Sequence, residues 1–343
     1  MNISDLSGKL KKELGDSFIT SAKEVANVER VPTGIYPVDY ATGGGFPRGM
    51  ISILWGAEGS TKTNLALKAI ANNQLLNPDQ TNVFIDMEHS FDPKWAELHG
   101  VDLSEDKFAL FKPQYGEQAV DILQKVIQAE DAGVVVLDSI GDLTTVNEYE
   151  STSDKMSVGG NAMLVTKMTK KVILDLAKQA QKGLFPTPIF INQMRTKIGV
   201  MYGSPDSMPG GNKLKHASAL TLRLTGKDLI DPAINKDRPA YKEVSGSIVK
   251  TKVPTLHKTF KFQYPIINQG GLHVGEIDDW NTIAAQLKDL GWMVKDGQKV
   301  HFNNQTFPTF KAVRELLYSD PALIANVRGQ IMAARMGEVY NVE

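Results

Sequence analysis

The stretch that decides the fold is Gly56-Ala57-Glu58-Gly59-Ser60-Thr61-Lys62-Thr63, which directly follows the apolar run Met50-Ile51-Ser52-Ile53-Leu54-Trp55. A strand that ends in a glycine-rich loop, then Lys-Thr, then a helical stretch is typical of a site that cradles a triphosphate. The backbone N–H groups of such a loop and the positive end of the helix face the phosphates. We therefore expect Lys62 to reach the β- and γ-phosphates, Thr63 to ligate Mg²⁺, and Asn64 to lie beside the nucleotide.

One position departs from this pattern, because Thr61 stands where such a loop usually has glycine. A β-branched side chain narrows the backbone conformations that are allowed there. The motif is therefore imperfect, and the rest of the chain must decide whether the loop holds a nucleotide.

The composition is that of an ordinary globular protein, with 42% hydrophobic residues, 22% charged residues and a formal net charge of −1. A net charge near zero gives no overall attraction for a polyanion such as nucleic acid. Nucleic-acid binding would therefore need local basic patches. The absence of cysteine excludes disulfides, thiolate metal sites and cysteine nucleophiles. An intracellular location fits a chain without cysteine. No apolar run approaches membrane-spanning length, and residues 1–12 lack an apolar signal core.

Apolar residues recur at three- and four-residue steps near the N-terminus, which predicts an amphipathic helix. They are Ile3, Leu6, Leu10, Leu14 and Phe18. A polar stretch, residues 21–30, separates this helix from the nucleotide-binding unit. The helix either packs on its own domain or docks on a neighbouring subunit, and the residues leave both possibilities open.

From Val31 onward, apolar strands alternate with helical segments, which predicts an α/β fold with a mostly parallel sheet covered on both faces. The expected strands are Ile51–Trp55, Val83–Met87, Val134–Asp138 and Pro188–Asn192. After His216 the pattern becomes β, and a glycine-rich break follows Asn268. We expect an N-terminal helix and linker over 1–32, an ATPase-type core over 33–268 and a small α+β domain over 269–343.

Three of these strands end in polar side chains, and ligands bind at the carboxyl ends of strands in such sheets. Asp138 would help to hold Mg²⁺, although an Asp in this position is often only a helix cap. Glu88 would position the attacking water, or else be a solvated acid or a salt-bridge partner. Gln193 would hydrogen-bond the γ-phosphate. His89 is expected to be structural, because no second His or Cys stands at metal-binding spacing.

The segment 194–215 is rich in glycine and contains Arg195, Lys197, Lys213 and Lys215 against a single acid, Asp206. It is predicted to be a mobile basic loop, which either binds a phosphate backbone or is a plain surface loop. A second irregular loop, residues 147–160, contains several acids and is no charge patch.

Lys250 and Lys252 alternate along a predicted strand, so both project from the same side. A run of lysines is usually a solvated face. Alternatively, the two ammonium groups would form a small cationic site that can bind a phosphate on another subunit.

Taken together, these motifs are similar to those of the bacterial RecA-type recombinases or of a phage-encoded relative. The resemblance covers roughly residues 30–265 and includes the ends of three strands, Phe84-Ile85-Asp86-Met87-Glu88-His89, Leu137-Asp138-Ser139 and Phe190-Ile191-Asn192-Gln193-Met194-Arg195. It also includes Lys197-Ile198-Gly199-Val200-Met201-Tyr202-Gly203, Gly210-Gly211-Asn212-Lys213-Leu214-Lys215 and Val249-Lys250-Thr251-Lys252.

The resemblance implies a role for each residue that matches the family. Lys62 and Thr63 would bind ATP and Mg²⁺ with Asp138 behind them, Glu88 would activate water, and Gln193 would sense the γ-phosphate. Asp92 and Trp95 would contact adenine, and Lys250 and Lys252 would reach a neighbour's ATP. The residues implied in DNA binding are Met156, Gly159, Gly160, Asn161, Arg195, Thr196, Lys197, Ile198, Val200, Gly210, Gly211 and Asn212.

The resemblance further implies a cytoplasmic recombinase that forms helical filaments on single-stranded DNA and exchanges strands with double-stranded DNA. Its N-terminal helix would be the polymerisation element. Thr61 and His216 depart from the family, His216 at a position where an aromatic residue contacts the next protomer. Two other functions use some of the same residues: a ring-shaped helicase, and a DNA-binding scaffold whose nucleotide site Thr61 has disabled.

Overall fold

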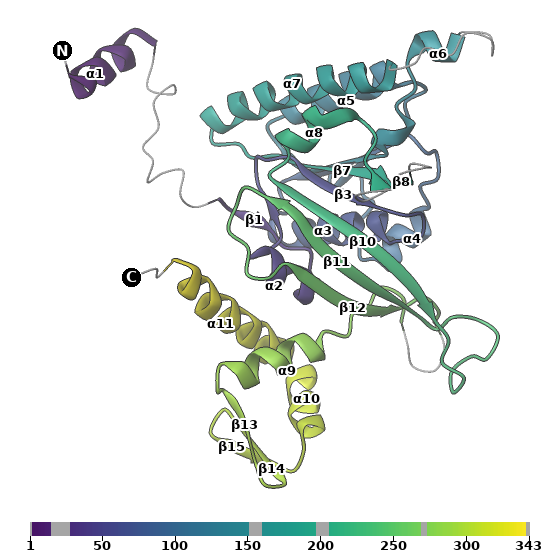
Figure 1. Cartoon of the computed structure of the whole chain (residues 1–343), viewed down its shortest axis with the longest axis vertical. Helices are drawn as coiled ribbons and strands as arrows, with labels where there is room; N and C mark the ends of the chain where they lie inside the picture. Colours follow the sequence, from purple (N-terminus) through teal and green to yellow (C-terminus); the bar gives the residue numbers. More distant parts are fainter. Residues whose placement is uncertain (1, 15–27, 151–159, 197–205, 269–272, 341–343) are drawn as a thin grey trace.

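The structure, a computed structural model, describes residues 2–14, 28–150, 160–196, 206–268 and 273–340. Its centre is an eight-stranded sheet in the order β12-β11-β10-β3-β7-β6-β4-β5 (Figure 1). The strands from β10 to β5 are mutually parallel, and β11 and β12 are antiparallel additions at one edge. The eight strands are β3 (Ser52–Gly56), β4 (Thr81–Asp86), β5 (Phe108–Phe111), β6 (Ala132–Asp138), β7 (Thr187–Gln193), β10 (Leu220–Leu229), β11 (Tyr241–Thr251) and β12 (Thr259–Pro265). The predicted mostly parallel α/β sheet is confirmed.

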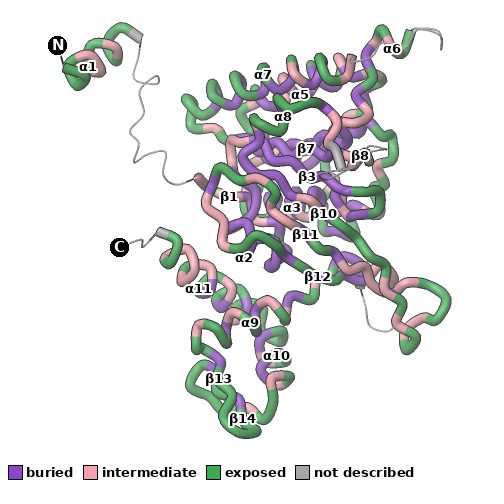
Figure 2. Tube along the Cα trace, viewed as in Figure 1, coloured by how far each residue is buried: buried purple, intermediate pink, exposed green. Residues whose placement is uncertain are grey.

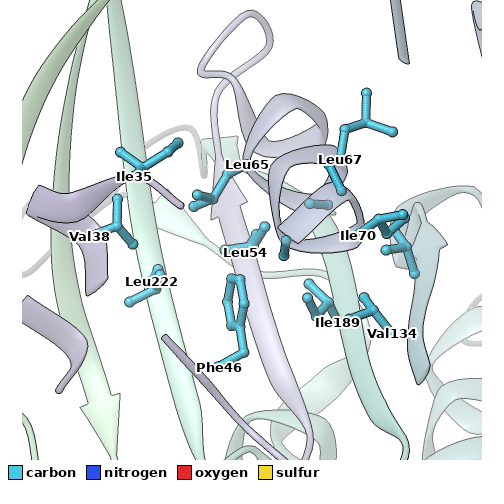
Figure 3. Close-up of a cluster of buried hydrophobic side chains, with 14 of the residues drawn as sticks. Ile35, Val38, Phe46, Leu54, Leu65, Leu67, Ile70, Val134, Ile189 and Leu222 are labelled. Atoms are coloured by element: carbon cyan, nitrogen blue, oxygen red, sulfur yellow. The ribbon is translucent and has the colours of Figure 1, made fainter. Parts of the chain in front are cut away.

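Helices cover both faces of this sheet because its strands are apolar on both sides. On one face, Leu54 packs with Leu65 and Ile70 of α3 (Lys62–Leu76), as Figure 3 shows. On the other face, the neighbouring Ile53 belongs to the cluster under α5 (Gly116–Gln128) and α7 (Gly160–Gln181). The central strands β3 and β7 are buried over almost their whole length, and they are purple in Figure 2.

Shorter elements complete the core and its loops. They are β1 (Arg30–Val31), α2 (Tyr36–Thr42), β2 (Phe46–Pro47), α4 (Pro93–Leu98), a 3₁₀ turn (Ile140–Asp142), α6 (Val146–Glu150), β8 (Arg195–Thr196), β9 (Asp206–Ser207) and α8 (Gly211–Ala217). Two loop predictions are therefore wrong at their ends. The segment 194–215 ends inside helix α8, and the segment 147–160 begins inside α6 and ends at the start of α7.

A small C-terminal unit has its own hydrophobic cluster. It contains α9 (Trp280–Asp289), β13 (Met293–Asp296), β14 (Lys299–Phe302), β15 (Gln305–Phe307), α10 (Phe310–Ser319) and α11 (Pro321–Tyr340). Tyr36 of α2 is part of the same cluster, and the Tyr40 hydroxyl donates to Gln286 Oε1 at 2.8 Å. These contacts attach the C-terminal unit to α2. The predicted boundary near 268 adjoins residues outside the described ranges, and the three-part division stays a prediction.

Helix α1 (Ile3–Leu14) forms where the apolar spacing predicts it, and it stands apart from the sheet in Figure 1. Phe18, the last apolar position of the pattern, lies outside the described residues. Within the described ranges, the chain contains no helix that is both long and apolar enough to span a bilayer.

Candidate nucleotide and DNA site

The glycine-rich loop joins β3 to α3, so it lies at the carboxyl end of a central strand and at the N-terminus of a helix. Lys62 is buried, and its Nζ donates to the carbonyls of Gly56 at 3.2 Å and Ala57 at 2.9 Å. Burial lowers the pKa of this lysine, and the nearby Asp138 carboxylate opposes that shift. The Lys62 ammonium is therefore held on the inner side of the loop.

Thr61 adopts a left-handed conformation, with φ 73° and ψ 22°. This region suits glycine and is strained for a β-branched residue, which is why the usual pattern has glycine there. The Thr61 hydroxyl is buried and has no hydrogen-bond partner among the described residues. Thr61 thus keeps the backbone shape of the loop at a conformational penalty.

The two predicted metal ligands contact each other. The Thr63 hydroxyl donates to Asp138 Oδ2 at 2.8 Å across the gap between α3 and the end of β6. Burial and the adjacent Glu88 raise the pKa of Asp138 to about 7, while Thr63 and Lys62 act against this shift. A buried carboxylate next to a hydroxyl, with other acids nearby, suits a hard cation that also takes phosphate oxygens. The residues present therefore fit Mg²⁺.

Glu88 and Gln193 are also brought together, although they are far apart in sequence. Gln193 Nε2 donates to Glu88 Oε1 at 2.8 Å. The sheet order explains this contact, because Gly56 of β3 is paired with Gln193 of β7 and Asp86 of β4 is paired with Asp138 of β6. The strand ends that the sequence singled out therefore converge on one edge beside the glycine-rich loop.

The predicted adenine contacts lie near this loop. Asp92 caps α4, since its carboxylate accepts from the backbone N–H groups of Lys94 and Trp95. The Trp95 indole N–H donates to Asn64 Oδ1 at 2.9 Å, and Asn64 Nδ2 donates to the Tyr264 hydroxyl at 2.8 Å. Sequence reasoning missed Tyr264, because an aromatic residue in an edge strand carries no signal of a partner 200 positions away. A nucleobase role for Asp92 and Trp95 stays a prediction.

The predicted DNA-binding residues fall into four groups: those outside the described ranges, those in β8, those at the start of α8 and those at the start of α7. Met156, Gly159, Lys197, Ile198 and Val200 lie outside the described residues. The backbone of Arg195 and Thr196 forms β8, which pairs with β9. Gly210 and Gly211 have positive φ and lead into α8, where Asn212 follows, while Gly160 begins α7.

Two asparagines form hydrogen bonds between the core and the starts of α7 and α8. The Asn161 amide donates to the carbonyls of Ile140 and Leu143, after β6. Asn192 Nδ2 donates to the carbonyl of Pro209 at 2.8 Å, directly before α8. The residue next to Asn192 is Gln193, so the start of α8 is linked to the strand end that contacts Glu88.

Within the single chain, Lys250 and Lys252 contact the end of α8. Lys250 Nζ donates to the carbonyls of Lys215, His216 and Ser218, and Lys252 Nζ donates to the carbonyl of Ala217 at 3.3 Å. Cations are favourable at a helix C-terminus, where carbonyls lack partners. Lys250 lies in β11, whereas Lys252 follows the last residue of that strand, Thr251, so the prediction that both lysines lie on one strand is wrong for Lys252. Both ammonium groups nevertheless contact the end of α8.

The comparisons with known proteins agree with this geometry. The family model described as the RecA N-terminal domain matches residues 3–272. The chain is 34% identical to Protein RecA of Fusobacterium nucleatum, covering 97% of this chain and 84% of the relative. It is 33% identical to Protein RecA of Aquifex aeolicus, covering 97% and 92%, and 32% identical to that of Bacteroides thetaiotaomicron, covering 95% and 94%. The chain belongs to the RecA family.

Proposed function

We propose that this chain is an ATP-dependent recombinase that assembles into helical filaments on single-stranded DNA and catalyses homologous pairing and strand exchange with double-stranded DNA. The observation that carries the proposal is the contact of Glu88 with Gln193, beside the Thr63–Asp138 pair, in a chain of the RecA family. This contact links Glu88, a carboxylate that can activate water, to the end of β7, after which the basic segment 194–215 begins.

The chemistry proposed at the site is hydrolysis of ATP to ADP and phosphate. Lys62 and the loop N–H groups would hold the phosphates, and Thr63 with Asp138 would hold Mg²⁺, which neutralises charge on the β- and γ-phosphates. The Glu88 carboxylate would take a proton from a water molecule as its oxygen attacks the γ-phosphorus and the bond to the ADP oxygen breaks. The Gln193 amide, which contacts Glu88, would meet the same phosphate.

The coupling to DNA would run through the segment that follows Gln193. A γ-phosphate would compete with Glu88 for the Gln193 amide, because that amide donates to the Glu88 carboxylate at 2.8 Å. Movement of Gln193 would displace its neighbour Asn192. Because Asn192 hydrogen-bonds the Pro209 carbonyl, the start of α8 would move as well. ATP binding would then favour the form that binds DNA, and ATP hydrolysis would favour release of the DNA.

Lys250 and Lys252 would act between protomers. Their contacts with α8 would have to open before they could reach a neighbour's phosphates, so assembly and the position of α8 would be linked. Helix α1 would be the polymerisation element.

Electron microscopy tests this function directly. The full chain is mixed with single-stranded DNA, Mg²⁺ and a non-hydrolysable ATP analogue, with a matched sample that lacks the analogue. Open helical filaments that depend on the analogue are expected. Closed rings would favour a helicase-type motor, and nucleotide-independent coating of DNA would favour a scaffold.

A further inference from the structure

A second lysine, besides Lys62, contacts the glycine-rich loop, from its outer side. Lys242 lies on β11, and its Nζ donates to the carbonyl of Gly59 at 3.1 Å. The same ammonium forms an ion pair with Asp228 Oδ1 at 3.0 Å, and the Lys242 side chain is 19% exposed. Asp228 and Lys242 face each other across the β10–β11 hairpin, whose far end projects beyond the sheet in Figure 1.

The backbones of the loop and the hairpin are in close contact around this lysine. A side chain at Gly226 would place its Cβ 2.7 Å from the Gly59 carbonyl oxygen, and one at Gly56 would place its Cβ 2.2 Å from the Leu224 carbonyl oxygen. No side chain fits at either position without a backbone shift. The Gly59 carbonyl is therefore held against the hairpin, and Lys242 is the side chain that donates to it.

We propose that Lys242 is a positioning residue for nucleotide phosphate binding. A peptide group is planar, and its carbonyl and the next N–H point in opposite directions. Fixing the Gly59 carbonyl outward therefore directs the Ser60 N–H inward. That N–H now donates to the Ala57 carbonyl at 3.3 Å, on the side of the loop where Lys62 Nζ also lies. Lys242 would thus orient the Ser60 N–H for phosphate binding without contacting the phosphate itself.

The role of Lys242 rests on the proposed function only in requiring that this loop binds a nucleoside di- or triphosphate. The competing role is purely structural, in which Lys242 serves only to pair with Asp228. The two roles differ in what Asp228→Asn does, because that change removes the ion pair and leaves the Lys242–Gly59 hydrogen bond possible.

The test measures binding of fluorescent ADP and of a fluorescent non-hydrolysable ATP analogue to the full chain with Mg²⁺ and without DNA. The variants are Lys242→Met, Lys242→Arg, Asp228→Asn and, as a matched control, Lys236→Met, which changes an exposed lysine between the same two strands. Thermal unfolding of each variant shows whether it is folded. The KM for ATP and kcat are measured with single-stranded DNA.

We expect Lys242→Met to raise both dissociation constants and the KM by about fivefold while kcat changes little, since a charge-assisted hydrogen bond that presets the loop is lost. Lys242→Arg should restore most of the affinity, Asp228→Asn should cost less than twofold, and Lys236→Met should leave binding unchanged. Affinity of Lys242→Met within twofold of the wild type, or an equal loss in Asp228→Asn, would overturn the role. Because this binding assay contains no DNA, its result is independent of whether filaments or strand exchange are seen.

Discussion

At the scale of single residues, Thr61 has an unfavourable backbone conformation and Asp138 is a buried acid with a raised pKa, both within the candidate nucleotide site. Thr61 has a positive φ and a buried hydroxyl without a partner among the described residues. Thr61→Gly should therefore raise the free energy of unfolding by about 1 kcal/mol, because glycine accepts this backbone and removes the hydroxyl. Thermal denaturation measures the effect, with Thr166→Gly at a half-buried position of α7 as a control that should lower the free energy of unfolding. A less stable Thr61→Gly variant would show that the threonine makes a favourable contact.

The raised pKa of Asp138 predicts that the free energy of unfolding depends on pH. Its pKa is about 7 in the folded chain and near 3.8 when unfolded, so the folded state binds the proton more tightly. Stability from this group is greatest at low pH and falls as the pH rises from about 4 to about 7. Asp138→Asn should flatten the curve over that window in urea unfolding without Mg²⁺. Asp39 also has a pKa of about 7 and remains in both proteins, so it cancels in the comparison. An unchanged slope in Asp138→Asn would contradict the assignment.

At the scale of elements, the short helix α8 depends on Lys250, since this one ammonium donates to three carbonyls at and beyond the end of the helix. Lys250→Met should increase amide hydrogen exchange in Gly211–Ala217 by about fivefold without nucleotide or DNA, because a C-terminal cation is worth up to about 1 kcal/mol. Lys252→Met should have a smaller effect, and Lys258→Met, an exposed lysine between β11 and β12, should have none. Unchanged exchange in Lys250→Met would mean that the lysine does not hold the helix.

The same helix shows what the sequence could and could not predict. The convergence of Asp138, Glu88 and Gln193 was predictable, because carboxyl ends of parallel strands meet at one sheet edge. The start of α8 was not, since two glycines and a nearby proline favour a loop until Val165, Ile140 and Asn192 pack around that turn. Tyr264 and Lys242 were missed for a related reason. Tyr264 contacts Asn64 of α3 and Lys242 contacts Gly59 of the loop only because the sheet places β11 and β12 beside them. Such contacts depend on strand order, which local patterns do not encode.

At the scale of the whole molecule, the proposed function requires the nucleotide loop, the segment after Gln193 and a neighbouring protomer to act together. Strand exchange between circular single-stranded DNA and a homologous linear duplex, with ATP and Mg²⁺, tests this most directly. Joint molecules should form with the wild type and a homologous duplex, and should be absent with a heterologous duplex or with Lys62→Ala, which removes the ammonium that we propose binds phosphate. DNA-stimulated ATP hydrolysis without homology-dependent joint molecules, or joint molecules at wild-type yield with Lys62→Ala, would contradict the account.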